Sequence, residues 1–497
     1  MRQTDGPPIA RESTASPQRR LGLLDCVCVM VGIVVGAGLF ETTPLVAASV
    51  GQLHWLVLVW SLGGLVALLG ALCYAELATS FPESGGDYVF LTKAYGRSWG
   101  FFFAWCEFWI IRPGNVGMLA YVFGRYAQQV FSLPLENYGM LVYASVAVVA
   151  LTTLNALGAR LGSGTQNALT IIKLVGIVWV ILAAASSSFT DDSGEVSTFG
   201  NERSHGVGVM SENPTATPLD QAEIGDQAEV AGAPAITFSG IYLAMIFVLL
   251  TYGGWGEMSY VAAEIRAPEK NIARALIVGT SLVILIYLGF NLACWRALGM
   301  TRLSESEAVA TEVVGAAMGQ GSGRLVSLLV ALSCLGAING MLFTGSRVYF
   351  AMGADHRTFS WLGAWSSRFD APVRSLWLQM LVTVGLILTF GNTDESFEKL
   401  VVFTTPVFWF FSCLIAASVM ILRRQTRDRN GIFRVWLYPI PPLALGATSV
   451  FMLYASLSWA LQNIAPQWLW TLAVVLVGIG AAWAGSRTAD GDRRTPV

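Results

Sequence analysis

Two clusters of glycine lie inside long apolar segments, where an interruption of the helix would expose backbone groups able to bind a ligand. The clusters are Gly32, Gly36 and Gly38, and Tyr252-Gly253-Gly254-Trp255-Gly256. Unwinding a helix frees N–H donors on one half and C=O acceptors on the other, which hydrocarbon cannot satisfy. A helix N-terminus suits a carboxylate, and freed carbonyls suit an ammonium. The two clusters therefore predict a site for a small zwitterion such as an α-amino acid.

The segments that carry these glycines belong to a series of about twelve apolar runs. The chain of 497 residues is 54% hydrophobic and 12% charged, and its mean hydropathy of +0.59 is too high for a soluble globule. Runs of about 20 apolar residues can each cross a ~30 Å hydrocarbon layer. We predict an all-α integral membrane protein with spans near 22–49, 54–79, 98–130, 138–157, 165–187, 237–262, 274–298, 323–352, 374–391, 398–422, 438–462 and 467–485.

The two glycine clusters occupy mirrored positions in their spans. Gly36 lies about 15 residues from one end of its span, and Gly253 lies about 16 residues from the opposite end of its own. Five spans separate the two starts, so the second unit enters the membrane from the other side. We predict an inverted repeat, residues 21–187 against 237–422, followed by two extra helices over 438–485. Such paired interruptions point to a transporter's binding site, although the glycines could also serve only close helix packing.

Lys173 and Glu257 are the candidate coupling residues. Lys173 lies about eight residues into its span, where its charge is costly without a partner or a water-filled cavity, and we favour a functional ammonium over snorkelling. Glu257 and Glu264 are seven residues apart on one helical face and could line a cation path. For Glu264, contacts with Arg266 or Arg274 are the favoured alternative.

Other charges receive structural interpretations. Glu107 and Arg112 share one span, but five residues of α-helix place them about 140° apart, so each is expected to have another partner, as a gate element or in a structural pair. Charges that flank the loop 81–86 are expected to be solvated. They are Glu76, Asp87, Lys93 and Arg97.

The distribution of basic residues predicts the orientation. With a cytoplasmic N-terminus, the inward loops contain most of the Lys and Arg outside the spans, and the outward loops contain only Arg203 and Arg302. We expect cytoplasmic tails at 1–20 and 486–497, one transporter domain over 21–485, and a flexible external loop at 188–236. The polar N-terminal stretch lacks the apolar core of a signal peptide.

Cysteine and histidine usage gives no sign of a metal site or an enzyme. All seven cysteines fall inside the expected spans and are interpreted as small packing residues. The chain has only three histidines, and no cluster in the spans has metal-ligand spacing. We therefore expect no cofactor, no metal, no nucleic acid and no catalytic chemistry, with the lipid bilayer and a small solute as the partners.

Several motifs resemble one transporter family. From about Leu21 to Leu461 the chain resembles an amino acid–polyamine–organocation permease, with most similarity to the L-type amino acid transporter branch. The motifs are Gly36-Ala37-Gly38-Leu39-Phe40, Cys73-Tyr74-Ala75-Glu76-Leu77 leading to Pro82 and Gly85-Gly86, Ile111-Arg112-Pro113, Tyr252-Gly253-Gly254-Trp255, and Phe343-Thr344-Gly345-Ser346-Arg347.

The resemblance implies a LeuT-type fold with a five-plus-five inverted repeat and two C-terminal helices. It also implies a substrate site at the two glycine clusters. There the N–H groups near Ala37 and Gly38 would bind the substrate carboxylate, and the substrate ammonium would be bound by the carbonyls of Val34, Leu250 and Gly253. The side chains of Leu250, Tyr252 and Trp255 would bound the substrate side chain. The full set of expected substrate-binding residues is Val34, Gly36, Ala37, Gly38, Leu250, Tyr252, Gly253, Gly254 and Trp255.

The same resemblance implies sodium-independent transport. Lys173 falls where similar permeases place an ammonium in the position of a sodium ion, which implies exchange or proton-linked transport. The chain departs from the family pattern at Ala37, where a hydroxyl residue is common, and at Leu250, where a gating aromatic is common, so substrate preference does not carry over. The outer loop 131–137 lacks cysteine, so no covalent glycoprotein subunit is expected.

We therefore predict a secondary active amino acid transporter in a plasma or bacterial inner membrane, working by alternating access and favouring neutral substrates. In this mechanism the spans at 22–49, 54–79, 237–262 and 274–298 rock against the others. A polyamine or amine carrier is one alternative, although an amine would leave the N–H groups at Gly38 unused. A sensor that binds an amino acid without moving it is another, although its tails are short for signalling.

Overall fold

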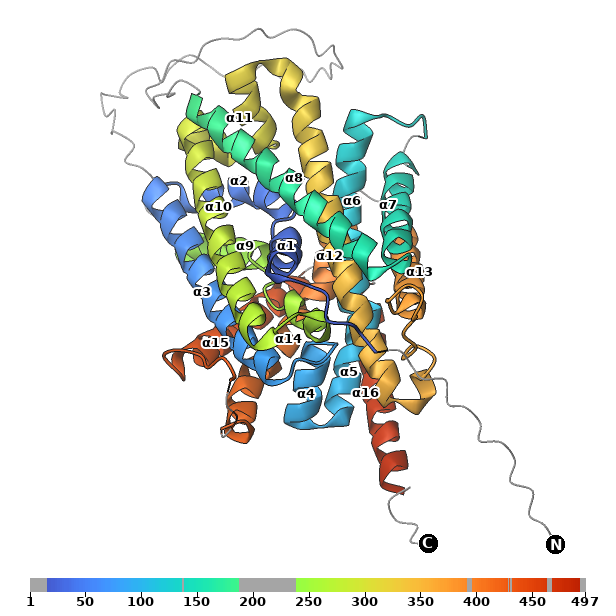
Figure 1. The fold of residues 1–497 in the computed structure, drawn as a ribbon. Coiled ribbons are helices and arrows are strands. Elements are labelled where there is room, and N and C mark those ends of the chain that lie inside the picture. Colours follow the sequence, from blue (N-terminus) through green and yellow to red (C-terminus); the bar gives the residue numbers. More distant parts are fainter. Residues whose placement is uncertain are drawn as a thin grey trace, which may run out of the picture.

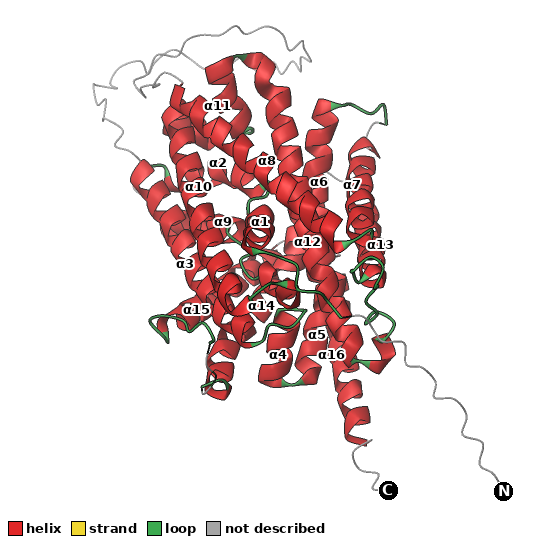
Figure 2. Ribbon diagram, in the orientation of Figure 1, coloured by secondary structure: helices red, strands yellow, loops and turns green. Residues whose placement is uncertain are grey.

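Helices form the fold throughout the part of the chain that the computed structural model describes, which is residues 16–135, 138–186, 238–390, 396–427, 429, 431–462 and 467–491 (Figure 2). In these residues the only extended pairings are two isolated β-bridges. The helices are α1 (Leu23–Val34), α2 (Gly38–Val50), α3 (Leu53–Ser80), α4 (Asp87–Tyr95), α5 (Arg97–Cys106), the π-helix η1 (Glu107–Ile111), α6 (Arg112–Val130), α7 (Gly139–Ala156), α8 (Ala159–Ser186), α9 (Phe238–Thr251), the 3₁₀ helix η3 (Glu257–Glu264), α10 (Pro268–Glu305), α11 (Val309–Met318), η4 (Gln320–Ser322), α12 (Gly323–Asp355), η5 (Arg357–Phe359), α13 (Val373–Phe390), α14 (Ser396–Gln425), α15 (Ile440–Gln462) and α16 (Gln467–Gly491).

Eight of the described helices are long and apolar enough to cross a membrane, and the bent pair α1–α2 makes a ninth. The eight are α3, α7, α8, α10, α12, α13, α14 and α15. The remaining expected spans are interrupted or have shorter apolar stretches, such as Gly240–Thr251 in α9 and Trp470–Ala482 in α16. The chain is therefore an all-helical, multi-pass membrane protein, and the count of twelve spans remains a prediction.

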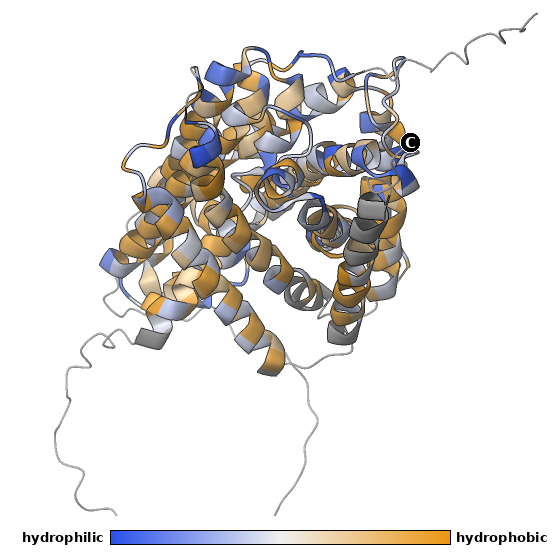
Figure 3. Cartoon of the chain, turned by 90° about the horizontal axis from the view of Figure 1, so that it is seen from below, coloured by the Kyte–Doolittle hydropathy of each residue, from blue (hydrophilic) through white to orange (hydrophobic). Residues whose placement is uncertain are grey.

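The helices surround a continuous buried core, and their outer faces are apolar. On α8, for example, Val175 and Leu182 are 64% and 63% exposed, a pattern suited to lipid rather than water. Figure 3 shows hydrophobic residues along the helices of the outer ring. In Figure 1, the long helices α8 and α12 cross the front of the bundle, with α11 near one end and α4 near the other.

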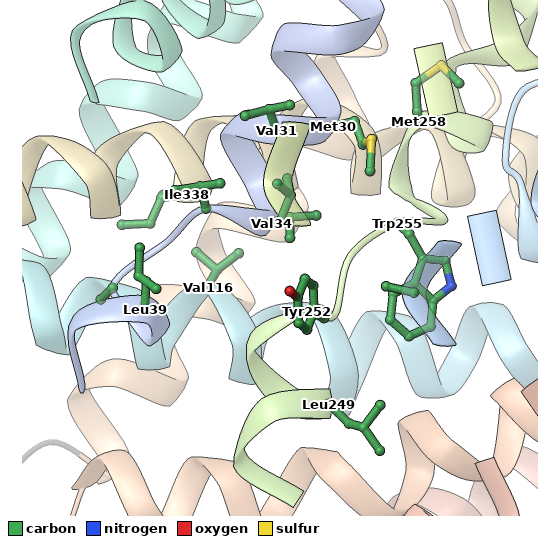
Figure 4. Close-up of a cluster of buried hydrophobic side chains, with 14 of the residues drawn as sticks. Met30, Val31, Val34, Leu39, Val116, Leu249, Tyr252, Trp255, Met258 and Ile338 are labelled. Carbon is green, nitrogen blue, oxygen red and sulfur yellow. The ribbon is translucent and has the colours of Figure 1, made fainter. Parts of the chain in front are cut away.

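Both glycine clusters interrupt helices. The first span is broken between Val34 and Gly38, where Val35 leaves the helical region (φ −80°, ψ 78°) and the axis bends by 48°. The second span is broken between Thr251 and Glu257, where Gly254 adopts φ +105°. Figure 4 shows both unwound segments, one next to Val34 and one between Tyr252 and Trp255.

Some expectations lie outside the described residues or remain untested. The loop at 188–236 lies outside them, as do residues 1–15 of the N-terminal tail and 492–497 of the C-terminal tail. The boundaries of the inverted repeat, and its five-plus-five arrangement, stay predictions.

Candidate functional site

The two broken helices lie against each other in the centre of the bundle. Helix α2 packs on α9, and α1 packs on η3. The hydroxyls of Thr42 and Thr251 are 2.8 Å apart across this contact. A Cβ added to Gly254 would lie 3.3 Å from Ile33 and 3.4 Å from Val34. The fold thus brings the two glycine clusters, more than 200 residues apart in the chain, into one site.

The first break presents N–H groups. Among the described residues, no acceptor is bonded to the backbone N–H groups of Ala37, Gly38 and Leu39, which begin α2. Gly38 is half-buried, whereas Ala37 is 2% exposed. The start of α2 thus combines free donors with the positive end of a helix dipole, an arrangement suited to a carboxylate.

The second break presents carbonyl groups, but its best-placed acceptors already have partners. The carbonyl of Leu250 accepts from the N–H of Gly253 at 3.2 Å. Gly253 and Gly254 are half-buried, so their backbone is accessible from within the bundle. The ring of Tyr252 is 1% exposed and packs on Trp60, with its hydroxyl donating to the Trp60 carbonyl at 3.2 Å. Tyr252 therefore anchors the unwound segment to α3.

Tyr287 connects the two breaks and was missed by the sequence analysis. Its hydroxyl lies 2.8 Å from the carbonyl oxygen of Val34 and 3.2 Å from that of Thr251, so it can donate to either broken helix. The Val34 carbonyl also accepts from the N–H of Gly36 at 2.9 Å. A ligand ammonium at Val34 would share this oxygen with Tyr287. A tyrosine in an apolar span carries no local signal for such a role.

Lys173 lies behind the first break with its ammonium fully engaged. Its Nζ donates to the carbonyls of Gly32 at 2.8 Å, Val35 at 2.6 Å and Ser333 at 3.0 Å. The side chain is fully buried, so it does not snorkel to the surface. The ammonium joins the unwound end of α1 to α12, and two of its three N–H donors satisfy carbonyls that the broken helix cannot.

Close packing explains one glycine of the first cluster and not another. A Cβ on Gly32 would lie 2.1 Å from Nε2 of Gln166 and 2.3 Å from Oγ1 of Thr170, so Gly32 lets α1 approach α8. A Cβ on Gly36 would meet only ordinary contacts, the nearest at 3.6 Å from Leu119. The packing interpretation therefore holds for Gly32 but leaves Gly36 free for another role.

The expectation that Glu107 and Arg112 lie too far apart to pair is wrong, whereas the expected second partner does exist for Arg112. Arg112 Nε donates to Glu107 Oε1 at 2.7 Å, and both side chains are 2% exposed. Residues 107–111 form a π-helix, in which the N–H of Arg112 bonds to the carbonyl of Glu107. An i→i+5 turn places residues five apart on the same side, whereas an α-helix separates them. The separation of about 140° expected for these two residues applies only to a regular α-helix.

Glu257 joins the same pair, and it does not form a path with Glu264. Both oxygens of Glu257 accept from Arg112 Nη1 at 2.9 Å, and the Thr344 hydroxyl lies 2.6 Å from Glu257. Glu264 instead accepts from Arg347 of α12, at 2.8 Å and 3.1 Å. The favoured partners of Glu264, Arg266 and Arg274, are thus replaced by Arg347, because η3 packs directly on α12.

Two residues expected to be solvated are buried. Glu76 is 2% exposed and accepts from Arg423 at 2.9 Å and from the N–H of Val435 at 2.8 Å. Asp87 is 7% exposed and accepts from the hydroxyls of Tyr74 at 3.1 Å and Tyr260 at 3.0 Å. This end of α3 is covered by helices α14 and α15 and by the 3₁₀ helix η3. That burial could not be predicted from the position of Glu76 and Asp87 next to a turn. Lys93 does lie at the surface, paired with Glu83.

The conformation of Gly254 makes it the glycine most sensitive to substitution. Gly254→Ala forces an L residue to φ +105°, at a cost of roughly 1–3 kcal/mol, and presses a methyl group toward α1. We expect at least a tenfold loss of substrate uptake by the reconstituted protein. Gly385→Ala is the control, because it adds a methyl group in open space within α13 and should leave uptake unchanged. Equal uptake by the two variants would contradict a role for the Gly254 conformation.

The described residues contain no group of His, Cys, Asp and Glu side chains able to hold a metal ion. The seven cysteines are all free, and six of them are buried. The site is therefore built from backbone groups, one buried lysine and a cluster of charged side chains.

Comparison with known proteins connects this arrangement to a transport function. The family model for amino acid permeases matches residues 21–481. The chain is 26% identical to b(0,+)-type amino acid transporter 1 of Mus musculus, over 94% of this chain and 88% of that protein. It is 27% identical to the human cystine/glutamate transporter over 88% of this chain and 80% of that protein.

A bacterial relative is similar over most of its length. The serine/threonine exchanger SteT of Bacillus subtilis (strain 168) is 26% identical, over 88% of this chain and 91% of that protein. These relatives are amino acid transporters and not enzymes. With a family match that spans nearly the whole chain and a polar site between two broken helices, the chain belongs to the amino acid permeases, as a membrane transporter of amino acids.

Proposed function

We propose that this chain is a sodium-independent amino acid exchanger or permease that works by alternating access. The observation that carries the proposal is the Lys173 ammonium, which donates to carbonyls of Gly32, Val35 and Ser333 between α1 and α12. Without the Lys173 side chain, a cation bound by these backbone carbonyls would have to come from solution. A covalently attached ammonium performs the same electrostatic task without sodium.

The substrate would lie at the two breaks. Its carboxylate would accept from the N–H groups at Ala37 and Gly38, and its ammonium would donate to carbonyls near Val34 and Gly253. The Tyr287 hydroxyl has one proton, so it can donate to the carbonyl of Val34 or to that of Thr251 but not to both at once. When the substrate ammonium arrives at Val34, Tyr287 would release Val34 and donate to Thr251. An amine without a carboxylate would leave the N–H groups unused, which favours amino acids over polyamines.

Neutral substrates are favoured by the state of the nearby carboxylates. Glu257 and Glu107 already accept hydrogen bonds from Arg112, so neither is free to pair with a cationic side chain. Trp255, which lies within the second break, is 5% exposed and adds an apolar boundary. We place leucine-sized or smaller neutral amino acids first among candidate substrates.

The outer side of the site has contacts that could form a gate in place of an aromatic at Leu250. Phe40 and Phe290 meet edge to face with ring centroids 5.4 Å apart, and Glu41 pairs with Arg125. These contacts join α2 to α10 and α6. We propose that they part when the site opens outward.

The orientation and location follow from the charge distribution. Most Lys and Arg residues outside the spans lie in loops of one side, which supports cytoplasmic termini in a plasma or bacterial inner membrane. The short segment 131–137 has no cysteine, so we propose that no glycoprotein subunit is attached covalently there.

Uptake into proteoliposomes tests the proposal. Vesicles are prepared in sodium-free buffer, either empty or preloaded with roughly 1 mM unlabelled amino acid, and should take up labelled neutral amino acids. If exchange dominates, the preloaded vesicles should take up label roughly tenfold faster. Decarboxylated amines should not compete. A requirement for sodium would refute the role assigned to Lys173. Binding of amino acids without any uptake would indicate a sensor instead.

A further inference from the structure

A small cavity continues from the second break toward α4. Its volume is about 30 Å³, which is large enough for water, and its lining includes Gly254, Glu257, Tyr74 and Asp87. Asp87 is the first residue of α4, in the segment between the spans at 54–79 and 98–130. The cavity therefore links backbone of the candidate substrate site to a carboxyl group outside the membrane-spanning segments.

The charges around this cavity do not balance. Three carboxyl groups, those of Asp87, Glu107 and Glu257, have one guanidinium among them, that of Arg112. Arg347 and Glu264 form a separate pair that is already neutral. An uncompensated buried charge costs several kcal/mol, so a group in this position binds a proton or a cation.

Asp87 is the carboxyl group with an available oxygen. Its Oδ2 accepts from Tyr74 and Tyr260, whereas its buried Oδ1 has no partner among the described residues. Glu107 and Glu257, in contrast, share Arg112. A proton on Oδ1 would neutralise the carboxylate of Asp87. It would also make this oxygen, which has no partner among the described residues, a hydrogen-bond donor.

The electrostatic surroundings agree with this assignment. The pKa of Asp87 is raised to about 7: burial raises it most, the hydrogen bonds from Tyr74 and Tyr260 lower it, and the negative charges of Glu107 and Glu257 add to the increase. The facing groups are Tyr74 from α3, Glu257 and Tyr260 from η3, Glu107 from η1 and Arg112 from α6.

We propose that Asp87 is a proton-binding site of the transport cycle, taking one proton from water as a carboxylate and returning it from the carboxyl form. The inference rests on the proposed transport function. Tyr74 on α3 and Tyr260 on η3 both donate to Asp87, so the protonation state sets how firmly η3 is held to α3. Hydrogen bonds to a carboxylate are roughly twice as strong as those to a neutral acceptor. Protonation would therefore loosen the inner half of the second broken helix.

The test is uptake by reconstituted protein at equal internal and external pH, from pH 5.5 to 8.5, followed by uptake driven by an imposed pH gradient. We expect the wild-type rate to change about threefold or more, with a midpoint near pH 7. Asp87→Asn should flatten this profile and abolish the response to the gradient, while exchange at a fixed pH continues. Glu83→Gln, an exposed carboxylate of the same loop that pairs with Lys93, is the matched control and should behave as wild type.

A second measurement does not depend on transport. An unfolded aspartate has a pKa near 3.9, so between about pH 4 and 7 the folded protein binds more protons at Asp87, and stability falls as pH rises. The thermal midpoint in detergent should therefore fall from pH 5 to 8 less steeply for Asp87→Asn than for Glu83→Gln. If Asp87→Asn keeps the wild-type pH profile and gradient response, the proposal is wrong and Lys173 is the remaining candidate. If no protein exchanges amino acid at any pH, the transport function itself fails.

Discussion

Lys173→Ala is expected to reduce amino acid uptake by about 100-fold or more. The substitution removes the donor shared by the carbonyls of Gly32, Val35 and Ser333, and of these Val35 also accepts from the Ser333 hydroxyl at 3.2 Å. Each buried carbonyl that loses its partner costs about 1–3 kcal/mol, and 2.7 kcal/mol corresponds to a hundredfold change. The loss would fall on the geometry of the first break, because two of the three acceptors belong to it.

The measurement is initial uptake in sodium-free proteoliposomes, together with substrate binding to the purified protein. Lys93→Ala is the matched control, because this lysine is partly exposed, pairs with the exposed Glu83 and lies over the Phe81 ring, away from both breaks. It should transport as the wild type does. Restoration of Lys173→Ala by added sodium would support the electrostatic role directly, whereas wild-type uptake by the variant without sodium would overturn it.

Arg112→Ala is expected to have the largest effect on stability. Glu107 and Glu257 would be left as neighbouring carboxylates without a cation, and the Glu107 side chain is 2% exposed. Breaking a buried ion pair by removing one partner costs about 3–5 kcal/mol. We expect the thermal midpoint in detergent to fall by roughly 3–5 °C, or the yield of folded protein to collapse.

Two further variants separate lost pairing from a general packing defect. Glu107→Gln in the Arg112→Ala background removes one stranded charge and should recover part of the stability. Arg125→Ala breaks an ion pair whose arginine side chain is 51% exposed, so its thermal midpoint should change by only about 1 °C or less. Equal midpoints for Arg112→Ala and Arg125→Ala would show that Arg112 does not neutralise the cluster.

The main helices and the two breaks could be predicted from the sequence because their causes are local. An apolar run of about 20 residues specifies a membrane helix without reference to its neighbours. Glycine weakens a helix at the position where it stands, and both clusters do coincide with interruptions at Val35 and Gly254. The burial of Lys173 likewise followed from its place within an apolar run.

Local patterns misled the interpretation of charges. Helical spacing separated Glu107 from Arg112, but a π-helical turn of five residues brings them together. Proximity to a turn suggested that Asp87 was solvated, but η3 and α3 enclose it. In both cases the deciding feature was a departure from the regular α-helix or the position of a distant segment.

The sequence by itself determined that this protein is a helical membrane transporter of the amino acid permease type, and where its helices break. Only the tertiary structure decided which groups serve those breaks: Tyr287 between Val34 and Thr251, Lys173 on three carbonyls, and Arg347 with Glu264. Hydropathy and backbone propensity act over one helical segment. Pairing between charges and carbonyls depends on how helices pack, because the partners are supplied by segments 36 to 253 positions apart.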